Sequence, residues 1–186
     1  MMEKSGVVTL SHPAVAERPY ACRVADDVDQ WPRAGRALLA ELAAARGRVA
    51  LLAADTLSGA DWLVRRLRDD LHLTAAQLGQ ALADRKEPPT TEEISQACGD
   101  ATLISDIDLL FWPALPTGAL PFLTARARRV PTIAVWPGKI ADGRATYSAL
   151  GRPDYTDVAL RNVVVLRPRA TRFPDEVPFR IERILP

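Results

Sequence analysis

The sequence predicts a three-layer α/β domain built on a mostly parallel sheet of about five strands. Short unbroken apolar runs, too short to form helices of their own, recur along the chain and indicate strands buried on both faces. Segments with leucines at helical spacing separate these runs, and strands that alternate with helices form helix-covered parallel sheets. The 186 residues, 48% hydrophobic and 25% charged, fit one globular domain over 1–186.

The first third of the chain predicts one helix and one buried strand after an N-terminal extension. Residues 1–30 lack clear periodicity, although Val7–Leu10 could form a short strand. The Ala-, Leu- and Arg-rich stretch Arg33–Arg46 predicts a helix, and Gly47 suits its C-terminal cap. The apolar run Val49–Ala54 then predicts the first strand of the parallel sheet.

The middle of the chain predicts a turn followed by three helices. Asp55–Gly59 is expected to be the turn. The helices are separated by a charged and Pro-rich break at 85–89, and each has its own start signal. We expect a leucine-rich helix from Ala60, a helix from the N-cap Thr74 to Asp84, and a helix that opens with the capping box Thr90–Glu93, runs to Ala97 and ends at Gly99.

The last third predicts the remaining strands. Apolar runs indicate the strands, and an apolar segment after the Pro-rich loop 113–118 indicates a helix. In order we expect a strand at 101–106 continued by 109–112, a helix at 119–129, strands at 130–136 and 162–166, and a final edge strand at 179–184. Because 139–186 contains little helical pattern, it is a candidate add-on lobe.

The connection after the first strand occupies the position of a phosphate-binding P-loop, whose pattern is G-x-x-x-x-G-K-[ST]. In such a loop the glycines let backbone N–H groups wrap phosphates, the Lys neutralises phosphate charge, and the hydroxyl binds Mg²⁺. The corresponding frame runs Ala54, Asp55, Thr56, Leu57, Ser58, Gly59, Ala60 and Asp61. Only the second glycine survives, because Ala60 replaces the Lys and Asp61 replaces the hydroxyl. We therefore expect no nucleotide hydrolysis, and no cofactor or at most weak binding of ATP with Mg²⁺.

A carboxylate follows the second predicted strand of the sheet. P-loop NTPases place an Asp at the end of a neighbouring apolar strand, where it holds Mg²⁺ through water. Leu103–Asp106 has that form, and Asp108 lies two residues beyond. The alternative is that Asp106 only caps the strand end. Together with the loop frame, these acids complete the candidate nucleotide site and predict a P-loop-like fold.

Several sequence blocks resemble the BrxF family, the small P-loop proteins of type 3 BREX phage-defence systems. The stretch Leu71–Arg85 resembles a helical segment of that family. The stretch Leu103–Phe111 is similar to its L-L-D-x-I-E-I-L-F block. The stretch Ala125–Gly138 is similar to its S-R-N-R-x-x-V-A-A-W-P-G block. Thr146–Tyr155 is similar to its T-Y-A-x-P-G-H-P-E-Y block. With the loop frame, the resemblance covers about 48–158 and departs from the family at the P-loop.

The resemblance implies an accessory role in a multi-gene defence complex. The implied partners are the large ATPase, the methyltransferase and the alkaline-phosphatase-like protein of that system. A homo-oligomer is a further possibility. In ring-forming ATPases, an Arg near the corresponding strand can reach a neighbouring subunit's nucleotide, and Arg126, Arg128 and Arg129 precede the third predicted strand here. Since the loop is damaged, we expect this chain to act through protein contacts.

The charge distribution offers an alternative, namely DNA binding. Residues 1–122 carry 12 Lys and Arg against 17 Asp and Glu, whereas 123–186 carry 12 against 6, and eleven of those twelve cations are Arg. Arg binds phosphates bidentately, so the basic C-terminal third is a candidate nucleic-acid surface. The candidate residues are Arg126, Arg128, Arg129, Arg152, Arg167 and Arg169. The competing interpretation is an ordinary solvated surface, with cations at a helix C-terminus.

The sequence also predicts a location and excludes some classes of protein. No apolar run approaches the roughly 20 residues that span a bilayer, and Met1–Thr9 lacks the apolar stretch of a secretory signal. We expect a cytoplasmic protein without membrane contact. Two distant cysteines and two histidines in unrelated contexts predict neither a disulfide nor a metal site.

Overall fold

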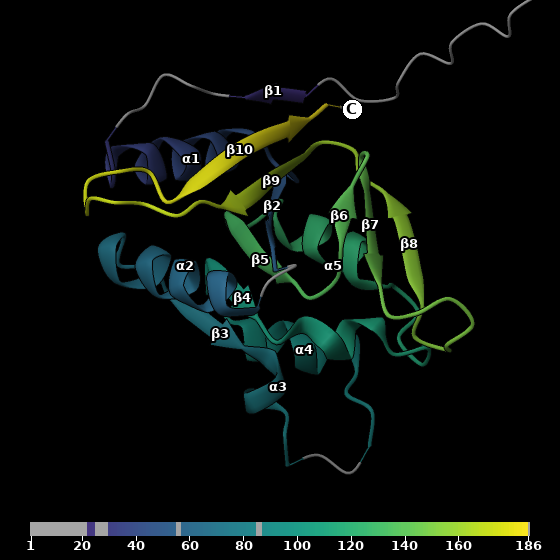
Figure 1. Ribbon diagram of the computed structural model, residues 1–186. Coiled ribbons are helices and arrows are strands. Elements are labelled where there is room, and N and C mark those ends of the chain that lie inside the picture. The colour runs from purple at the N-terminus through teal and green to yellow at the C-terminus, as the bar shows by residue number, and fades with distance from the viewer. Residues whose placement is uncertain (1–21, 25–29, 55–56, 85–86, 186) are drawn as a thin grey trace, which may run out of the picture.

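The main sheet is mixed and mostly parallel, as the sequence predicts. The computed structural model describes residues 22–24, 30–54, 57–84 and 87–185, with the side chains of 22–24 and 57–59 outside the description. The described strands follow the order β1-β10-β9-β2-β5-β4-β3 (Figure 1). The strands from β9 to β3 are parallel to one another, and β10 and β1 are antiparallel additions. The bounds are Cys22–Val24 (β1), Val49–Ala53 (β2), Ala75–Gln77 (β3), Leu103–Ser105 (β4), Thr132–Trp136 (β5), Val163–Pro168 (β9) and Phe179–Ile184 (β10).

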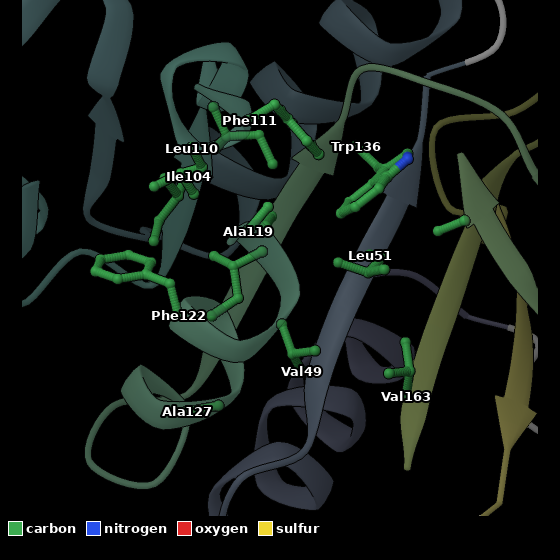
Figure 2. Packing of buried hydrophobic residues seen from close by; sticks show 14 of the residues in the cluster. Val49, Leu51, Ile104, Leu110, Phe111, Ala119, Phe122, Ala127, Trp136 and Val163 are labelled. Atoms are coloured by element: carbon green, nitrogen blue, oxygen red, sulfur yellow. The ribbon is translucent and has the colours of Figure 1, made fainter. Parts of the chain in front are cut away.

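Helices cover both faces of this sheet, which gives the expected three layers. The helices are α1 (Arg33–Ala44), α2 (Leu57–Asp70), α3 (Leu78–Ala81), α4 (Thr91–Cys98) and α5 (Ala119–Arg126). Because side chains alternate along a strand, Ala50 and Leu52 pack with α1 and α2, whereas Val49 and Leu51 pack with α4 and α5. Figure 2 shows Ala119 and Phe122 of α5, with the Phe122 ring turned toward Ile104 and away from Leu51 of β2.

The chain changes direction across the sheet at β2. From β2 it passes through α2 to the far strand β3, and then returns through β4 to β5, beside β2. Crossovers between parallel strands are right-handed, so the outward and return connections must cover opposite faces. This explains why α2 packs on one face while α4 and α5 pack on the other. The carboxyl end of β2 is therefore a topological switch point, where open α/β sheets place ligand sites.

A small antiparallel sheet packs beside α5. It contains β6 (Ile140–Ala141), β7 (Arg144–Tyr147) and β8 (Thr156–Ala159), in the order β6-β7-β8. Ile140 and Ala145 are buried in the same core as Val49 and Leu51. Of the predicted 139–186 lobe, residues 140–159 form this sheet, whereas β9 and β10 belong to the main sheet. Arg167 of β9 joins the two by donating to the carbonyl oxygen of Ile140 at 2.9 Å.

Two predicted segments are wrong. The expected helix from Thr74 to Asp84 begins as the strand β3, because pairing with β4 overrides the helix propensity of Ala and Gln, and only Leu78–Ala81 is α-helical. The expected strand continuation at 109–112 is a 3-10 helix, η1 (Ile107–Phe111). Asp106 turns the chain out of β4 with φ 53° and ψ 47°, a left-handed conformation that ends the strand.

Most other expectations are confirmed to within a few residues. α1, α4, α5 and the strands β2, β5, β9 and β10 stand where the sequence places them, and the capping box of Thr90 with Glu93 is formed. β10 is not an edge strand, because β1 pairs with its outer side. Val7–Leu10 lies outside the described residues. Within the described residues, no helix is long and apolar enough to cross a membrane.

Candidate functional site

The connection between β2 and α2 is shorter than the P-loop frame expects. β2 ends at Ala53 and α2 begins at Leu57, so only 54–56 lie between strand and helix. The predicted turn at 55–59 is therefore partly wrong, because Leu57 to Gly59 already belong to the helix. Asp55 and Thr56 lie outside the described residues. Of the backbone that would wrap a phosphate in a P-loop, Leu57 to Gly59 here form part of the first turn of α2.

The position equivalent to the P-loop Lys faces the core. Ala60 is 3% exposed and packs in the hydrophobic cluster under α1 and α2, which includes Leu63 and Leu67. A side chain there points away from the switch point. Ala54 is also buried, whereas Asp61 is exposed. The site therefore lacks the lysine and also the orientation that a lysine would need to reach a phosphate.

The predicted acids lie at the same end of the sheet but not next to β2. Asp106 and Asp108 are both exposed after β4. β5 stands between β2 and β4, and neighbouring strands lie about 4.8 Å apart, so β4 is roughly 10 Å from β2. Asp106 packs against Gly79 of α3. A Cβ added to Gly79 would lie 3.1 Å from the Cβ of Asp106. Asp106 is thus held at the strand end, beside α3.

Asp108 belongs to a packed group that sequence reasoning misses. It accepts a hydrogen bond of 3.0 Å from the hydroxyl of Tyr147. The Tyr147 ring stacks on Phe111 with centroids 3.9 Å apart, and Phe111 meets Trp136 edge-on at 5.0 Å. We call Phe111, Trp136 and Tyr147 the aromatic cluster, and Figure 2 shows two of its members, Phe111 and Trp136, near the carboxyl ends of β2 and β5.

A close backbone approach fixes the small sheet to this cluster. The indole Nε1 of Trp136 donates to the carbonyl oxygen of Thr146 at 2.9 Å. Gly138 lies so near that a Cβ added there would overlap the same carbonyl oxygen. Burial, the hydrogen bond to Asp108 and the charge of Asp108 raise the pKa of Tyr147 to about 12. Tyr147 therefore stays protonated at neutral pH and holds Asp108 as an acceptor.

The predicted nucleic-acid residues have different surroundings. Arg126 is 6% exposed and donates to the carbonyl oxygens of Gly99 and Ala101, so its guanidinium supports the fold. Arg167 is half-buried and pairs with Glu182 at 2.6 Å. Arg152 pairs with Asp154 at 3.2 Å. The other three, Arg128, Arg129 and Arg169, are exposed without a side-chain partner among the described residues.

The structure brings together only some of the groups that nucleotide chemistry needs. Among the described residues, no three Asp, Glu, His or Cys side chains gather into a possible metal site. A cavity of about 520 Å³ lies along the outer side of β3, lined by 74–77 with residues of α3 and α4, and it contains none of the predicted site residues. At the carboxyl end of the sheet, the described residues thus include two exposed carboxylates after β4, which would repel a phosphate, and the exposed Arg169 after β9.

Comparisons with known proteins add no relative. No family model matches the sequence, and neither a curated protein nor a solved structure matches it.

Proposed function

We propose that the chain is a non-hydrolytic, P-loop-like accessory component of a bacterial BREX phage-defence complex, which acts through contacts with the other proteins of that complex. The observation that carries the non-hydrolytic part is the placement of Ala60. Position 60 carries a buried alanine in place of the lysine, and Leu57 to Gly59, which would belong to the loop of a phosphate site, lie in α2. The alternative of a weak ATP-binding protein is disfavoured for the same reason.

The P-loop-like part of the proposal is supported by where the damaged frame lies. Ala54 to Asp61 follows β2 at the topological switch point, the position where doubly wound sheets bind phosphates on a helix N-terminus. The acid-ended strand β4 lies in the same parallel sheet, and its acids point to the same end. A nucleotide-binding ancestor that lost its loop accounts for this arrangement.

The defence-complex part is supported by the packing of three sequence blocks, each of which resembles the BrxF family, against one another in the fold. Asp108 and Phe111 come from the first block, Trp136 and Gly138 from the second, and Tyr147 from the third. All five lie in or beside the aromatic cluster, joined by the stacking and hydrogen bonds described above. The blocks are distant in sequence, so their joint resemblance concerns one packed region of the fold.

The same region presents apolar surface suited to a protein partner. Trp112 follows Phe111 directly and is 45% exposed, and Leu150 lies three residues after Tyr147 and is 83% exposed. Large exposed side chains of this kind are common anchors of protein interfaces. The loops that carry them are held by the Tyr147–Phe111 stack.

The test is co-expression of the tagged chain with the large ATPase, the methyltransferase and the alkaline-phosphatase-like protein, followed by affinity purification. We expect at least one of them to co-purify with the wild-type chain and to be lost with Trp112→Ser combined with Leu150→Ser. Phe173→Ser is the matched control, because Phe173 is 62% exposed on the β9–β10 connection. Failure of all three proteins to co-purify would overturn the proposal, as would equal loss in the control.

A further inference from the structure

The amino end of the parallel sheet carries a row of exposed arginines. Arg46 stands before β2, Arg128 and Arg129 stand before β5, and Arg161 stands before β9, and all four are exposed. We call them the amino-end arginines. β9, β2 and β5 are consecutive neighbours, and Val49 of β2 pairs in register with the first residues of the other two strands. The three loops that carry the arginines therefore lie side by side.

Hydrogen bonds and a close contact fix these loops to one another. The N–H of Gly47 donates to the carbonyl oxygen of Ala127 at 3.1 Å, which joins the loop of Arg46 to that of Arg128. Gly47 has φ 83°, and an added Cβ would lie 3.4 Å from Cγ of Arg128. Arg48 Nε donates to the Asn162 Oδ1 at 2.9 Å, which joins the loop before β2 to the loop of Arg161.

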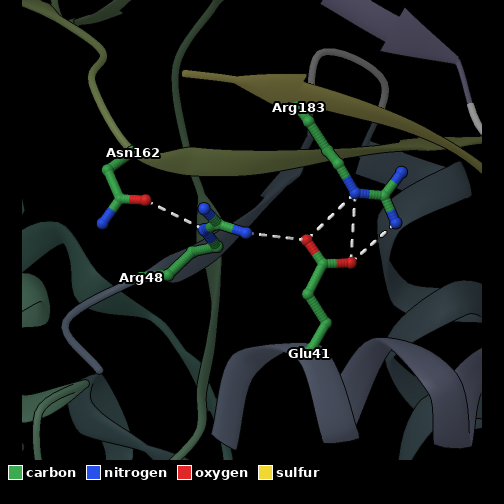
Figure 3. Close-up of polar contacts among 4 residues, drawn as sticks. All are labelled: Glu41, Arg48, Asn162 and Arg183. Atoms are coloured by element: carbon green, nitrogen blue, oxygen red, sulfur yellow. Dashed lines mark hydrogen bonds and ion pairs between the residues drawn. The ribbon is translucent and has the colours of Figure 1, made fainter. Parts of the chain in front are cut away.

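The carboxylate within this group of loops is already neutralised. Glu41 accepts from Arg48 at 3.0 Å and from Arg183 at 2.6 Å (Figure 3). Arg48 reaches this carboxylate of α1 from the loop before β2, and Arg183 reaches it from β10. The single negative charge of Glu41 is thus paired with two positive charges. Glu41 therefore does not neutralise the amino-end arginines.

The amino-end arginines keep their positive charge. Within the described parts of the chain, none of the four has an acidic partner within ion-pair distance. Two other acids lie on neighbouring loops, and neither forms an ion pair with the row: Asp100 precedes the next strand, β4, and Asp142 lies beside Gly143, whose carbonyl oxygen accepts from Leu160. The dipole at the end of α5 favours cations near Arg128 and Arg129 but does not neutralise them.

From this surface we propose that the amino end of the sheet binds the phosphate backbone of duplex DNA. Guanidinium groups match phosphate oxygens bidentately. The row covers three strands, about 10 Å of backbone, which lies between the widths of the minor and major grooves, about 6 and 12 Å. The long side chains can therefore reach phosphates on both sides of one groove.

The surroundings of the row favour a duplex over other partners. Single strands are bound by stacking their bases on aromatic rings. The large aromatic side chains exposed among the described residues, Trp112 and Phe173, follow β4 and β9 and so lie toward the opposite end of the sheet. A protein interface needs an apolar centre, and here the row has only the 38% exposed Leu185 nearby.

The test measures binding of the full chain to a fluorescent 20-base-pair DNA duplex across a salt series. Neutralising four phosphates predicts a slope of log K against log salt of about −3.6. We expect a loss of affinity of roughly a hundredfold between 50 and 200 mM salt. Arg46→Gln, Arg128→Gln, Arg129→Gln and Arg161→Gln combined should abolish binding, and the pairs Arg46/Arg161 and Arg128/Arg129 should each halve the slope.

A matched variant separates this surface from overall charge. Arg33→Gln, Arg36→Gln, Arg65→Gln and Arg172→Gln combined remove the same charge from exposed positions on α1, α2 and the β9–β10 connection. This control should bind like the wild-type chain, and circular dichroism should show all variants folded. Absent duplex binding, equal loss in the control, an unchanged slope in either pair, or tighter binding to single-stranded DNA or duplex RNA would each overturn the proposal. None of these results bears on co-purification, so the two proposals fail separately.

Discussion

The two ends of the parallel sheet differ in what their loops have kept. At the carboxyl end, where α/β folds place ligands, Ala60 faces the core and the exposed groups after β4 are acids. At the amino end, four exposed arginines stand on loops that are tied together. The difference indicates that the expected ligand end has become a packed structural region, while the opposite end retains free charge for a partner.

The largest expected effect tests the orientation of position 60. Ala60→Lys should destabilise the chain by about 4 kcal/mol, because a lysine there must be buried or lose its charge. Asp61→Lys is the control, since Asp61 is exposed and one residue away, and it should change the stability by less than about 0.5 kcal/mol. Urea unfolding measures both. Equal tolerance of the two variants would mean that position 60 faces solvent at the ligand end.

The next effect concerns the packing of the small sheet at the carboxyl end. Gly138→Ala should cost about 3 kcal/mol, because the new methyl group would overlap the carbonyl oxygen of Thr146 and force the backbones apart. Gly118→Ala meets no atom within 4 Å and should cost only the strain of φ 67°, about 1 kcal/mol. Thermal unfolding of the two variants compares them. A smaller loss for Gly138→Ala than for Gly118→Ala would contradict this close approach.

A smaller, pH-dependent effect is expected at the amino end. The hydrogen bonds from Arg183, assisted by Arg48 and opposed by burial, hold the pKa of Glu41 below its ordinary value of 4.5. A carboxylate with a lowered folded pKa stabilises the protein above its ordinary pKa, and this contribution is lost as pH falls through the folded value. Glu41→Gln should cost about 1–2 kcal/mol at pH 7, and the difference from wild type should shrink below pH 4.5.

Unfolding curves at pH 7 and at low pH measure this difference. Glu87→Gln is the charge-matched control, because Glu87 is exposed and should show little change at either pH. A pH-independent loss in Glu41→Gln would mean that packing, rather than charge, is the contribution of Glu41.

The smallest expected effect is the loss of the Tyr147 hydroxyl alone, which is compared with the loss of the whole ring. Tyr147→Phe keeps the stack on Phe111 and loses the hydrogen bond to Asp108, so it should cost about 1 kcal/mol. Tyr147→Ala also loses the stack and should cost about 3 kcal/mol. Thermal unfolding measures the pair. If both variants lost the same stability, the stack would contribute nothing and the aromatic cluster would not hold the loops.

The sequence predicts the main architecture because local signals dominate there. Unbroken apolar runs mark β2, β5 and β9, and the capping box of Thr90 marks α4. It fails where tertiary contacts decide. Ala75–Gln77 has helix-forming residues, yet it pairs with β4, and Asp106 leaves its strand in a left-handed turn that no local pattern announces.

The sequence predicts which P-loop residues are missing from the candidate site, but it does not predict the geometry of the site. The absence of the P-loop Lys is readable from Ala60, whereas its burial depends on how α2 packs on the sheet. The sequence alone assigns no nucleic-acid contact to Arg46 or Arg161, because only the register of β9, β2 and β5 places them beside Arg128. Their one local signal is a position just before a strand.

The most direct test of the central claim is titration of the isolated wild-type chain with ATP and Mg²⁺ by calorimetry, together with a turnover assay. We expect no saturable heat and no phosphate release, because a buried alanine stands at position 60 and Leu57 to Gly59 already belong to α2. Saturable binding with turnover that Asp106→Ala abolishes would contradict it.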